Sequence, residues 1–227
     1  MRKMIYSVAI DGPSGAGKSS LAKAAAAQLG ILYVDTGAMY RSIGYYMFRN
    51  GIDPENASDV IAALPSVCVA MRYGEDGLQR MLLNGEDVTD AIRLPEISQY
   101  ASKVSAIPAV RAFLLDTQRD MAKAQSVIMD GRDIATVVLP DADVKIYLTA
   151  SAQVRAQRRM KELAQRGTPS SFAEVLRDME ARDDADMHRE TAPLRQAEGA
   201  VLLDTSELDF EQSCQALLSI IKERVKI

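Results

Sequence analysis

The sequence is poor in the residues that build disulfide frameworks and metal centres. It contains two cysteines, Cys68 and Cys214, and a single histidine, His188. The cysteines are far apart and have no neighbouring cysteine or histidine at metal-ligand spacing, so neither a disulfide scaffold nor a zinc site is indicated. A reducing compartment is the simplest environment for such a chain. Little of its chemistry can depend on imidazole groups.

Long apolar runs and an excess of positive charge are also missing. No stretch is long and apolar enough to span a bilayer. The formal net charge of −4 argues against a general affinity for nucleic-acid backbones. Residues 1–10 resemble the start of a secretory signal, but the apolar part stops at Asp11 and Gly12 without a cleavage pattern. We therefore expect a cytoplasmic protein with no membrane or nucleic-acid partner.

What the chain does contain is a regular alternation of apolar, β-rich runs with helical patterns. This alternation is typical of βαβ units and predicts an α/β protein with a parallel five-stranded sheet covered by helices on both faces. The expected strands span residues 6–10, 31–34, 126–129, 143–148 and 200–203. The expected helices span residues 18–29, 38–49, 108–124, 152–165, 171–186 and 209–226.

One stretch, at about residues 65–93, interrupts this rhythm. Apolar runs at 67–73 and 78–83 and a short piece near Val88 are joined by connections at 74–77 and 84–85 that are rich in glycine and acidic or amide residues. Such spacing predicts a small antiparallel insert. At 227 residues, the chain is expected to form one domain with subdomains.

A phosphate-loop motif lies between the first expected strand and the first expected helix. The run from Gly12 to Ser19 fits the G-x-x-x-x-G-K-S pattern at every required position. Its glycines let successive N–H groups face a phosphate chain, and the helix dipole adds positive potential. Lys18 is then expected to reach the outer phosphates and Ser19 to bind Mg²⁺, although Ser20 leaves open which hydroxyl serves the metal. The expected ATP-binding residues are Gly12, Pro13, Ser14, Gly15, Ala16, Gly17, Lys18, Ser19 and Ser20.

A phosphate loop alone is compatible with GTPases, transport or repair ATPases and small-molecule kinases. The chain lacks an Asn-Lys-x-Asp guanine motif and a Leu-Ser-Gly-Gly transporter motif, and arginines recur on several expected elements. Guanidinium groups bind phosphate in bidentate fashion without titrating, as a kinase that joins two anions requires. Asp130, at the end of an expected strand, has the setting of an acidic residue that organises Mg²⁺. The arginines that recur on the expected elements are Arg41, Arg111, Arg132, Arg155, Arg158, Arg159, Arg182 and Arg189.

Several separate motifs together resemble the bacterial cytidylate kinases, a branch of the nucleoside monophosphate kinases, over essentially the full chain. The motifs span residues 11–18, 35–41, 84–93, 130–138 and 182–184, the last leading to Arg189. The resemblance implies a P-loop kinase fold with a small antiparallel β insert and a mobile lid. It implies direct in-line transfer of phosphate from ATP, with Mg²⁺ as cofactor, to CMP and dCMP. We expect the enzyme to be a monomer.

The resemblance also divides the chain into regions. The core would comprise residues 1–37, 125–151 and 190–227, the acceptor-binding region residues 38–124, and the lid with its following helix residues 152–189. In the acceptor region, Thr36 and Tyr40 resemble acceptor-site residues and Arg41 resembles the ligand of the acceptor phosphate. Without the resemblance, Tyr40 and Arg41 would be interpreted as the start of an ordinary amphipathic helix.

Three further residues, Ser102, Arg111 and Asp133, match the positions that surround the cytosine ring in the family. A carboxylate and a hydroxyl can accept hydrogen bonds from the exocyclic amine of cytosine, and an arginine can donate to its ring acceptors. Uracil presents a carbonyl oxygen where cytosine presents this amine, so Asp133 would disfavour UMP. Taken alone, Ser102 and Arg111 would be assigned to a solvated helix face.

The remaining arginines are assigned to phosphate and ribose by the same resemblance. Arg155 and Arg159 share a helical face, with Arg158 adjacent, but on an isolated helix such a group is usually solvated surface. Arg182, Asp186 and Arg189 could equally form an ion-pair ladder. The expected catalytic residues are Lys18, Arg132, Arg155, Arg159 and Arg182, and the metal ligands are Ser19 and Asp130. The expected CMP-binding residues are Thr36, Tyr40, Arg41, Ser102, Arg111, Arg132, Asp133, Arg182, Asp186 and Arg189.

Two kinds of alternative remain open at this point. One is a phosphate-loop kinase for another small acceptor, such as UMP, shikimate, gluconate or dephospho-coenzyme A. The other is a nucleotide-binding regulatory module, in which nucleotide occupancy or hydrolysis controls a partner. ATP turnover that depends on the acceptor separates the kinases from the module.

Overall fold

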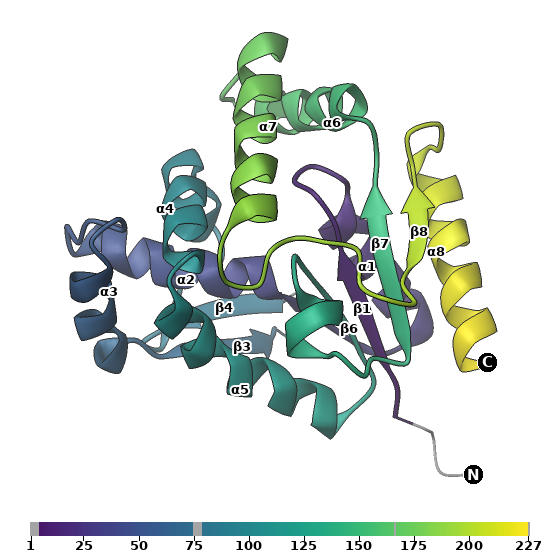
Figure 1. Ribbon diagram of the computed structural model, residues 1–227, viewed down its shortest axis with the longest axis horizontal. Helices are drawn as coiled ribbons and strands as arrows, with labels where there is room; N and C mark the ends of the chain where they lie inside the picture. The colour runs from purple at the N-terminus through teal and green to yellow at the C-terminus, as the bar shows by residue number, and fades with distance from the viewer. Residues whose placement is uncertain (1–4, 75–78, 166, 227) are drawn as a thin grey trace. The chain divides into compact units, whose positions relative to one another are not determined.

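The computed structural model describes residues 5–74, 79–165 and 167–226 (Figure 1). Two compact units can be distinguished: Met1–Val34 with Arg119–Ile227, and Asp35–Gln118. They are called the first and the second unit below, and each is described by itself. Among the described residues, no helix has the length and apolar character needed to cross a membrane.

The first unit is built on a five-stranded sheet. Its strands are β1 (Ser7–Asp11), β2 (Leu32–Asp35), β6 (Val127–Gly131), β7 (Val144–Thr149) and β8 (Val201–Asp204), in the order β2-β6-β1-β7-β8. β1 pairs in parallel with β6 and β7, and β7 pairs in parallel with β8. The predicted parallel sheet is therefore confirmed, with strand ends displaced by one or two residues.

Helices α1 (Lys18–Leu29) and α8 (Phe210–Val225) cover this sheet. Alanines at the buried positions of α1 let it pack closely, and together with leucines of α8 they form one apolar cluster with β1 and β7. All five residues of β6 are buried, as expected for a central strand of a parallel sheet with both faces covered. This packing fixes the carboxyl ends of β1 and β6, where Asp11 and Asp130 lie.

β7 is followed in the chain by a pair of helices, α6 (Ala152–Gln165) and α7 (Phe172–His188) (Figure 1). α7 begins with a capping box in which Ser171 and Glu174 satisfy each other's backbone N–H groups. The two helices share a small apolar cluster of their own, formed by Ala156, Leu163, Val175 and Met179. The predicted loop after Gln165 includes residue 166, which lies outside the described residues.

The second unit contains the predicted antiparallel insert. β3 (Val69–Tyr73) pairs with β4 (Gln79–Leu83), and β4 pairs with β5 (Glu86–Asp87), both in antiparallel fashion. The expected connection at 74–77 and the first residue of the run at 78–83 fall largely on residues 75–78, outside the described part of the chain.

Helices make up the rest of the second unit. α2 spans Thr36–Arg49, and α5 (Pro108–Ala124) begins in this unit and continues into the first. α3 (Ala57–Ala63) and α4 (Pro95–Ser105) were not expected from the sequence. Three short turns were also not foreseen: the 3₁₀ turns η1 (Leu64–Ser66) and η2 (Ala91–Arg93), and the π-helical turn η3 (Ile134–Val138) in the first unit.

Close packing of α2 against α4 depends on a glycine. A Cβ added at Gly44 would lie 2.8 Å from the backbone nitrogen of Ala101 and 3.1 Å from the Cβ of Tyr100. One turn farther along α2, the rings of Phe48 and Tyr100 meet edge to face with centroids 5.4 Å apart. The glycine therefore sets the distance at which α4 packs on α2.

We predict that Gly44→Ala destabilises the protein. Alanine favours a helix over glycine by about 1 kcal/mol, but a clash of 2.8 Å with backbone belongs to the upper part, about 2–3 kcal/mol, of the usual cost of overpacking, so the free energy of unfolding should fall by about 1–2 kcal/mol. Urea unfolding followed by circular dichroism measures the change. Gln99→Ala, an exposed substitution on α4, is the control and should have little effect. Equal or greater stability of Gly44→Ala would contradict the packing argument.

Candidate functional site

The phosphate loop joins β1 to α1 in the first unit, and two of its glycines are required by geometry. Gly12 has φ 151°, and a Cβ there would lie 1.9 Å from the carbonyl oxygen of Leu148 on β7. Gly17 has φ 89° and occupies the N-cap of α1, where no side chain caps the helix. The helix N-terminus is thus left for an anion, because its first N–H groups have no intrahelical acceptor.

Lys18, the first residue of α1, is buried beneath this loop. Its Nζ donates hydrogen bonds of 2.7 Å to the carbonyl oxygens of Gly12 and Pro13. Burial, and then the nearby positive charge of Arg132, lower the pKa of Lys18 well below its usual value, although the carboxylate of Asp130 opposes the shift. A bound phosphate chain would stabilise the charged ammonium and give it a stronger acceptor than a carbonyl.

Ser19 and Asp130, the two expected metal ligands, lie in contact. The Ser19 hydroxyl donates to one carboxylate oxygen of Asp130 at 2.8 Å, and the Tyr33 hydroxyl donates to the other at 2.9 Å. One hydroxyl and one carboxylate fit Mg²⁺, which commonly takes one or two protein oxygens and completes its octahedron with phosphate oxygens and water. In the described part of the chain no three His, Cys, Asp or Glu residues cluster in a way that could hold a metal. Ser19 and Asp130 are thus the two protein oxygen ligands that could hold Mg²⁺ at this loop.

Two side chains from α6 and α7 hold the backbone of the phosphate loop. Asp183 accepts a hydrogen bond from the Ser14 N–H at 2.8 Å, and Arg155 donates to the Ser14 carbonyl at 2.7 Å. Arg155 also pairs with Asp183 at 2.5 Å and is only 8% exposed. Arg155 is therefore not the solvated surface arginine that its helical pattern alone would indicate, and Asp183 is a contact that sequence reasoning missed.

The other two arginines of α6, Arg158 and Arg159, differ in the groups that they contact. Arg158 donates to the Thr205 carbonyl at 2.7 Å and to the Ala16 carbonyl in the phosphate loop at 3.4 Å. Arg159 pairs with Glu162 on its own helix at 2.8 Å. The contacts of the structure thus place Arg155 and Arg158, rather than Arg155 and Arg159, beside the phosphate loop.

Four of the residues expected to bind CMP form one arginine–carboxylate cluster in the first unit, which consists of Arg132, Asp133, Asp186 and Arg189. Arg132 donates to Asp186 at 2.8 Å, while Arg189 lies 3.6 Å from Asp186 and 3.7 Å from Asp133. Burial opposes ionisation of Asp186, but the charges of Arg132 and Arg182 outweigh it and hold its pKa below the usual value. The Asp186 carboxylate is therefore ionised at neutral pH and holds the guanidinium groups of Arg132 and Arg189 in place.

In the second unit, the beginning of α2 is organised by Asp35. This carboxylate accepts a hydrogen bond of 2.8 Å from the Ala38 N–H as the N-cap of α2, and its other oxygen pairs with Arg41 at 3.0 Å. Thr36, the first residue of the helix, is 2% exposed. Asp35 thereby fixes the side chain of Arg41, a role that was not assigned to it from the sequence.

Two of the other expected acceptor residues, Tyr40 and Arg111, meet in the same unit. The guanidinium carbon of Arg111 lies 5.4 Å from the ring centroid of Tyr40, a cation–π distance. Arg111 also donates to the Ser105 carbonyl at 3.0 Å, and the Ser105 hydroxyl donates to the Ser102 carbonyl at 2.8 Å. α2 and α5 therefore bring Tyr40 and Arg111 together, and Ser102 of α4 is linked to Arg111 through Ser105.

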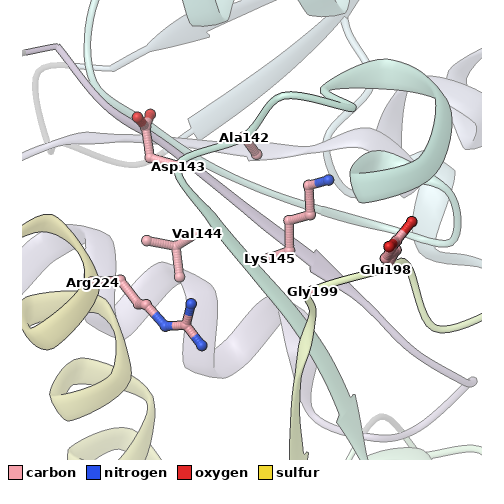
Figure 2. Close-up of a pocket in the computed structure, with 7 residues that line it drawn as sticks. All are labelled: Ala142, Asp143, Val144, Lys145, Glu198, Gly199 and Arg224. Atoms are coloured by element: carbon pink, nitrogen blue, oxygen red, sulfur yellow. The ribbon is translucent and has the colours of Figure 1, made fainter.

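A separate hollow of about 220 Å³ lies at the start of β7 (Figure 2). β7 begins there at Val144, whereas its last residues approach the phosphate loop through Leu148. Acidic and basic side chains are mixed around it, which does not favour an anionic nucleotide. Its lining residues are Ala142, Asp143, Val144, Lys145, Glu198, Gly199 and Arg224.

A parallel sheet whose first strand leads through a phosphate loop into a helix defines the class of phosphate-loop proteins. Solved structures share this fold: a protein from Eubacterium ventriosum, described as uncharacterized, matches with a TM-score of 0.56 and 12% identity, over 97% of this chain and 99% of its own. At this identity the likeness concerns the fold alone.

Residues 8–223 match the family model described as cytidylate kinase, and the chain belongs to this family. A cytidylate kinase from Caldicellulosiruptor bescii is 47% identical over 219 residues, which cover 96% of each chain. A cytidylate kinase from Caldanaerobacter subterraneus subsp. tengcongensis is 44% identical over 100% of this chain and 99% of its own. The family resemblance deduced from the motifs is confirmed.

We predict that Lys18→Ala reduces phosphoryl transfer far more than it affects folding. Loss of one positioned cationic donor should lower turnover by about 100-fold or more, whereas burial already disfavours the charge of Lys18 in the fold. Steady-state kinetics and urea unfolding measure the two effects. Lys23→Ala, an exposed substitution on the same helix, is the matched control. Near-normal turnover of Lys18→Ala would remove the lysine from the catalytic residues.

Proposed function

We propose that this protein transfers the γ-phosphoryl group of ATP to CMP and dCMP, producing CDP and dCDP. One observation carries the proposal: the arginine–carboxylate cluster lies in the same unit as a complete phosphate loop, in a chain of the cytidylate kinase family. The loop supplies a site for a triphosphate, and the cluster supplies cations for a second, smaller anion.

The phosphate loop would bind the donor. Its backbone N–H groups and the start of α1 surround the phosphates, and Lys18 exchanges its two carbonyl acceptors for phosphate oxygens. Mg²⁺, held by Ser19 and Asp130, would neutralise charge on the outer phosphates. Arg155 and Arg158 contact the loop from α6, and they would stabilise charge on the group being transferred.

The acceptor phosphate oxygen is already an anion, so the reaction needs no strong general base. Catalysis would depend on positioning and on compensation of charge. Arg132 and Arg182 in the first unit, and Arg41 in the second, are the proposed ligands of phosphate oxygens. Closure of α6 and α7 as a lid would exclude water, so that ATP is not simply hydrolysed.

Base selection is proposed to rest on Asp133, with Ser102 and Arg111 as further contacts. Asp133 is 4% exposed and lies near Arg189, so its carboxylate has little access to bulk water. If this carboxylate faced the carbonyl oxygen of uracil instead of the amine of cytosine, two hydrogen-bond acceptors would lie against each other with no donor between them. Such a mismatch costs a few kcal/mol. Asp186 would accept a hydrogen bond from a sugar hydroxyl.

The division of the chain into core, acceptor region and lid, a monomeric state and a cytoplasmic location complete the proposal. They rest on the sequence and on the family to which the chain belongs. Size-exclusion chromatography with light scattering tests the monomeric state.

We predict that CMP and dCMP are the preferred acceptors in a panel that also contains UMP, AMP, shikimate, gluconate and dephospho-coenzyme A. Coupled release of ADP from MgATP measures each rate. Shikimate and gluconate have no nucleobase, and AMP and dephospho-coenzyme A carry adenine instead of the cytosine that Asp133 is proposed to select, so these acceptors should give only background turnover. ATP consumption that is independent of every acceptor would favour a regulatory module and overturn the proposal.

We predict that Asp133→Asn reduces the discrimination between CMP and UMP. The amide of asparagine can donate to a uracil carbonyl, so the ratio of the two kcat/KM values should fall by about 10-fold to 100-fold. Asp141→Asn, an exposed change of the same chemistry, is the control. An unchanged ratio would show that Asp133 does not read the base.

A further inference from the structure

Asp11 is a buried carboxylate for which neither the motif nor the proposed mechanism provides a role. It is the last residue of β1, it is 2% exposed, and it lies opposite Gly131 of β6 in the sheet register. Its two oxygens accept one hydrogen bond each, both of 2.8 Å, from the backbone N–H groups of Ile134 and Ala135. The side chain thus reaches from β1 past the end of β6 to the turn η3.

A second charged side chain holds the other end of the same turn. Arg119 of α5 donates from Nε to the Val138 carbonyl at 3.1 Å and from Nη2 to the Val137 carbonyl at 3.0 Å. Asp11 therefore satisfies donors at the amino end of η3 and Arg119 satisfies acceptors at its carboxyl end. Both ends of an isolated turn would otherwise leave buried backbone groups without partners.

The turn needs such support because its geometry is unusual. π-helical turns are rare and occur frequently at functional sites. Within η3 the Leu139 N–H donates to the Ile134 carbonyl at 2.7 Å, and the N–H groups of Val137 and Val138 share the Asp133 carbonyl. Asp133 itself has the irregular backbone angles φ −144° and ψ 25°. Its conformation is thus tied to the turn that follows it.

Two residues of the arginine–carboxylate cluster, Arg132 and Asp133, lie between the end of β6 and this turn. A shift of η3 would move their backbone and so change the contacts of Arg132 with Asp186 and of Asp133 with Arg189. Since a misplacement of about 1 Å can weaken catalysis strongly, the support of the turn bears directly on the cluster.

We propose that Asp11 and Arg119 are positioning residues for the acceptor: together they clamp η3 and thereby fix Arg132 and Asp133 for binding and selection of the nucleoside monophosphate. The inference rests on the proposed roles of Arg132 and Asp133. It goes beyond them because neither clamp residue contacts the nucleotide in this scheme.

Burial raises the pKa of Asp11 to about 6, and the two N–H groups oppose that shift. At pH 8 the carboxylate is ionised and can accept both hydrogen bonds.

Arg119 gives the sharper test, because Asp11 is next to the phosphate loop in the chain. Arg119→Met keeps a side chain of similar bulk but removes both donors. We expect the KM for CMP to rise about 10-fold and the preference for CMP over UMP to fall, while the KM for ATP stays unchanged. Arg119→Lys should restore part of the loss, because an ammonium can still donate to the carbonyls. Lys123→Met, on the exposed face of the same helix, is the control.

If Asp11 and Arg119 both act by holding η3, their effects on the KM for CMP should not be independent. Asp11→Asn retains one acceptor oxygen and should shift the KM for CMP in the same direction, and the double variant with Arg119→Met should show less than the product of the two single effects. Urea unfolding of each variant reports on stability separately.

The outcomes are distinguishable. If the native protein phosphorylates CMP but Arg119→Met retains the native KM for CMP and the native CMP preference, the clamp is refuted and the proposed function stands. A variant that loses activity equally on CMP and UMP, with the KM for CMP unchanged, would assign Arg119 to stability alone and also refute the clamp. If the native protein itself does not phosphorylate CMP, the proposed function fails.

Discussion

The structure of the candidate site depends on buried carboxylates that hold cationic side chains in place. Guanidinium and ammonium groups gathered for phosphate repel one another, and a buried charge without a partner costs several kcal/mol. Asp183 holds Arg155 against the phosphate loop, and Asp186 holds Arg132. The carboxylates are therefore as necessary to the arrangement as the arginines. They allow the cations to be ordered before any nucleotide binds.

This arrangement implies an exchange of partners on binding. Lys18 is bonded to two backbone carbonyls of the loop, and Ser19 to Asp130. These are neutral or single-charge acceptors, whereas a phosphate chain offers several charged oxygens, so replacement gives stronger hydrogen bonds without moving the backbone. The energetic gain is then available for alignment of the reacting groups rather than for folding the site.

Much of the fold follows from the sequence because parallel strands are apolar on both faces. Each predicted strand, however, ends at its last apolar residue, one or two residues before the observed end. The omitted positions include Asp11, Asp35 and Asp204, which belong to β1, β2 and β8. A rule based on hydrophobicity truncates the strands where polar residues enter the sheet. Asp11 and Asp35 are among the residues that organise the site.

The contacts that the sequence did not predict join residues far apart in the chain. Asp183 meets Ser14, Tyr33 meets Asp130, and Arg119 meets the turn after β6, and no local periodicity encodes such pairs. The helix α4 has a pattern that could have revealed it, since Ile97, Ala101 and Val104 are buried at helical spacing after Pro95. The π-helical turn has no comparable signal, because its backbone is held by side chains from β1 and α5. Such a segment is specified by the packed protein as a whole, and its geometry can serve the reaction only once those distant elements have assembled.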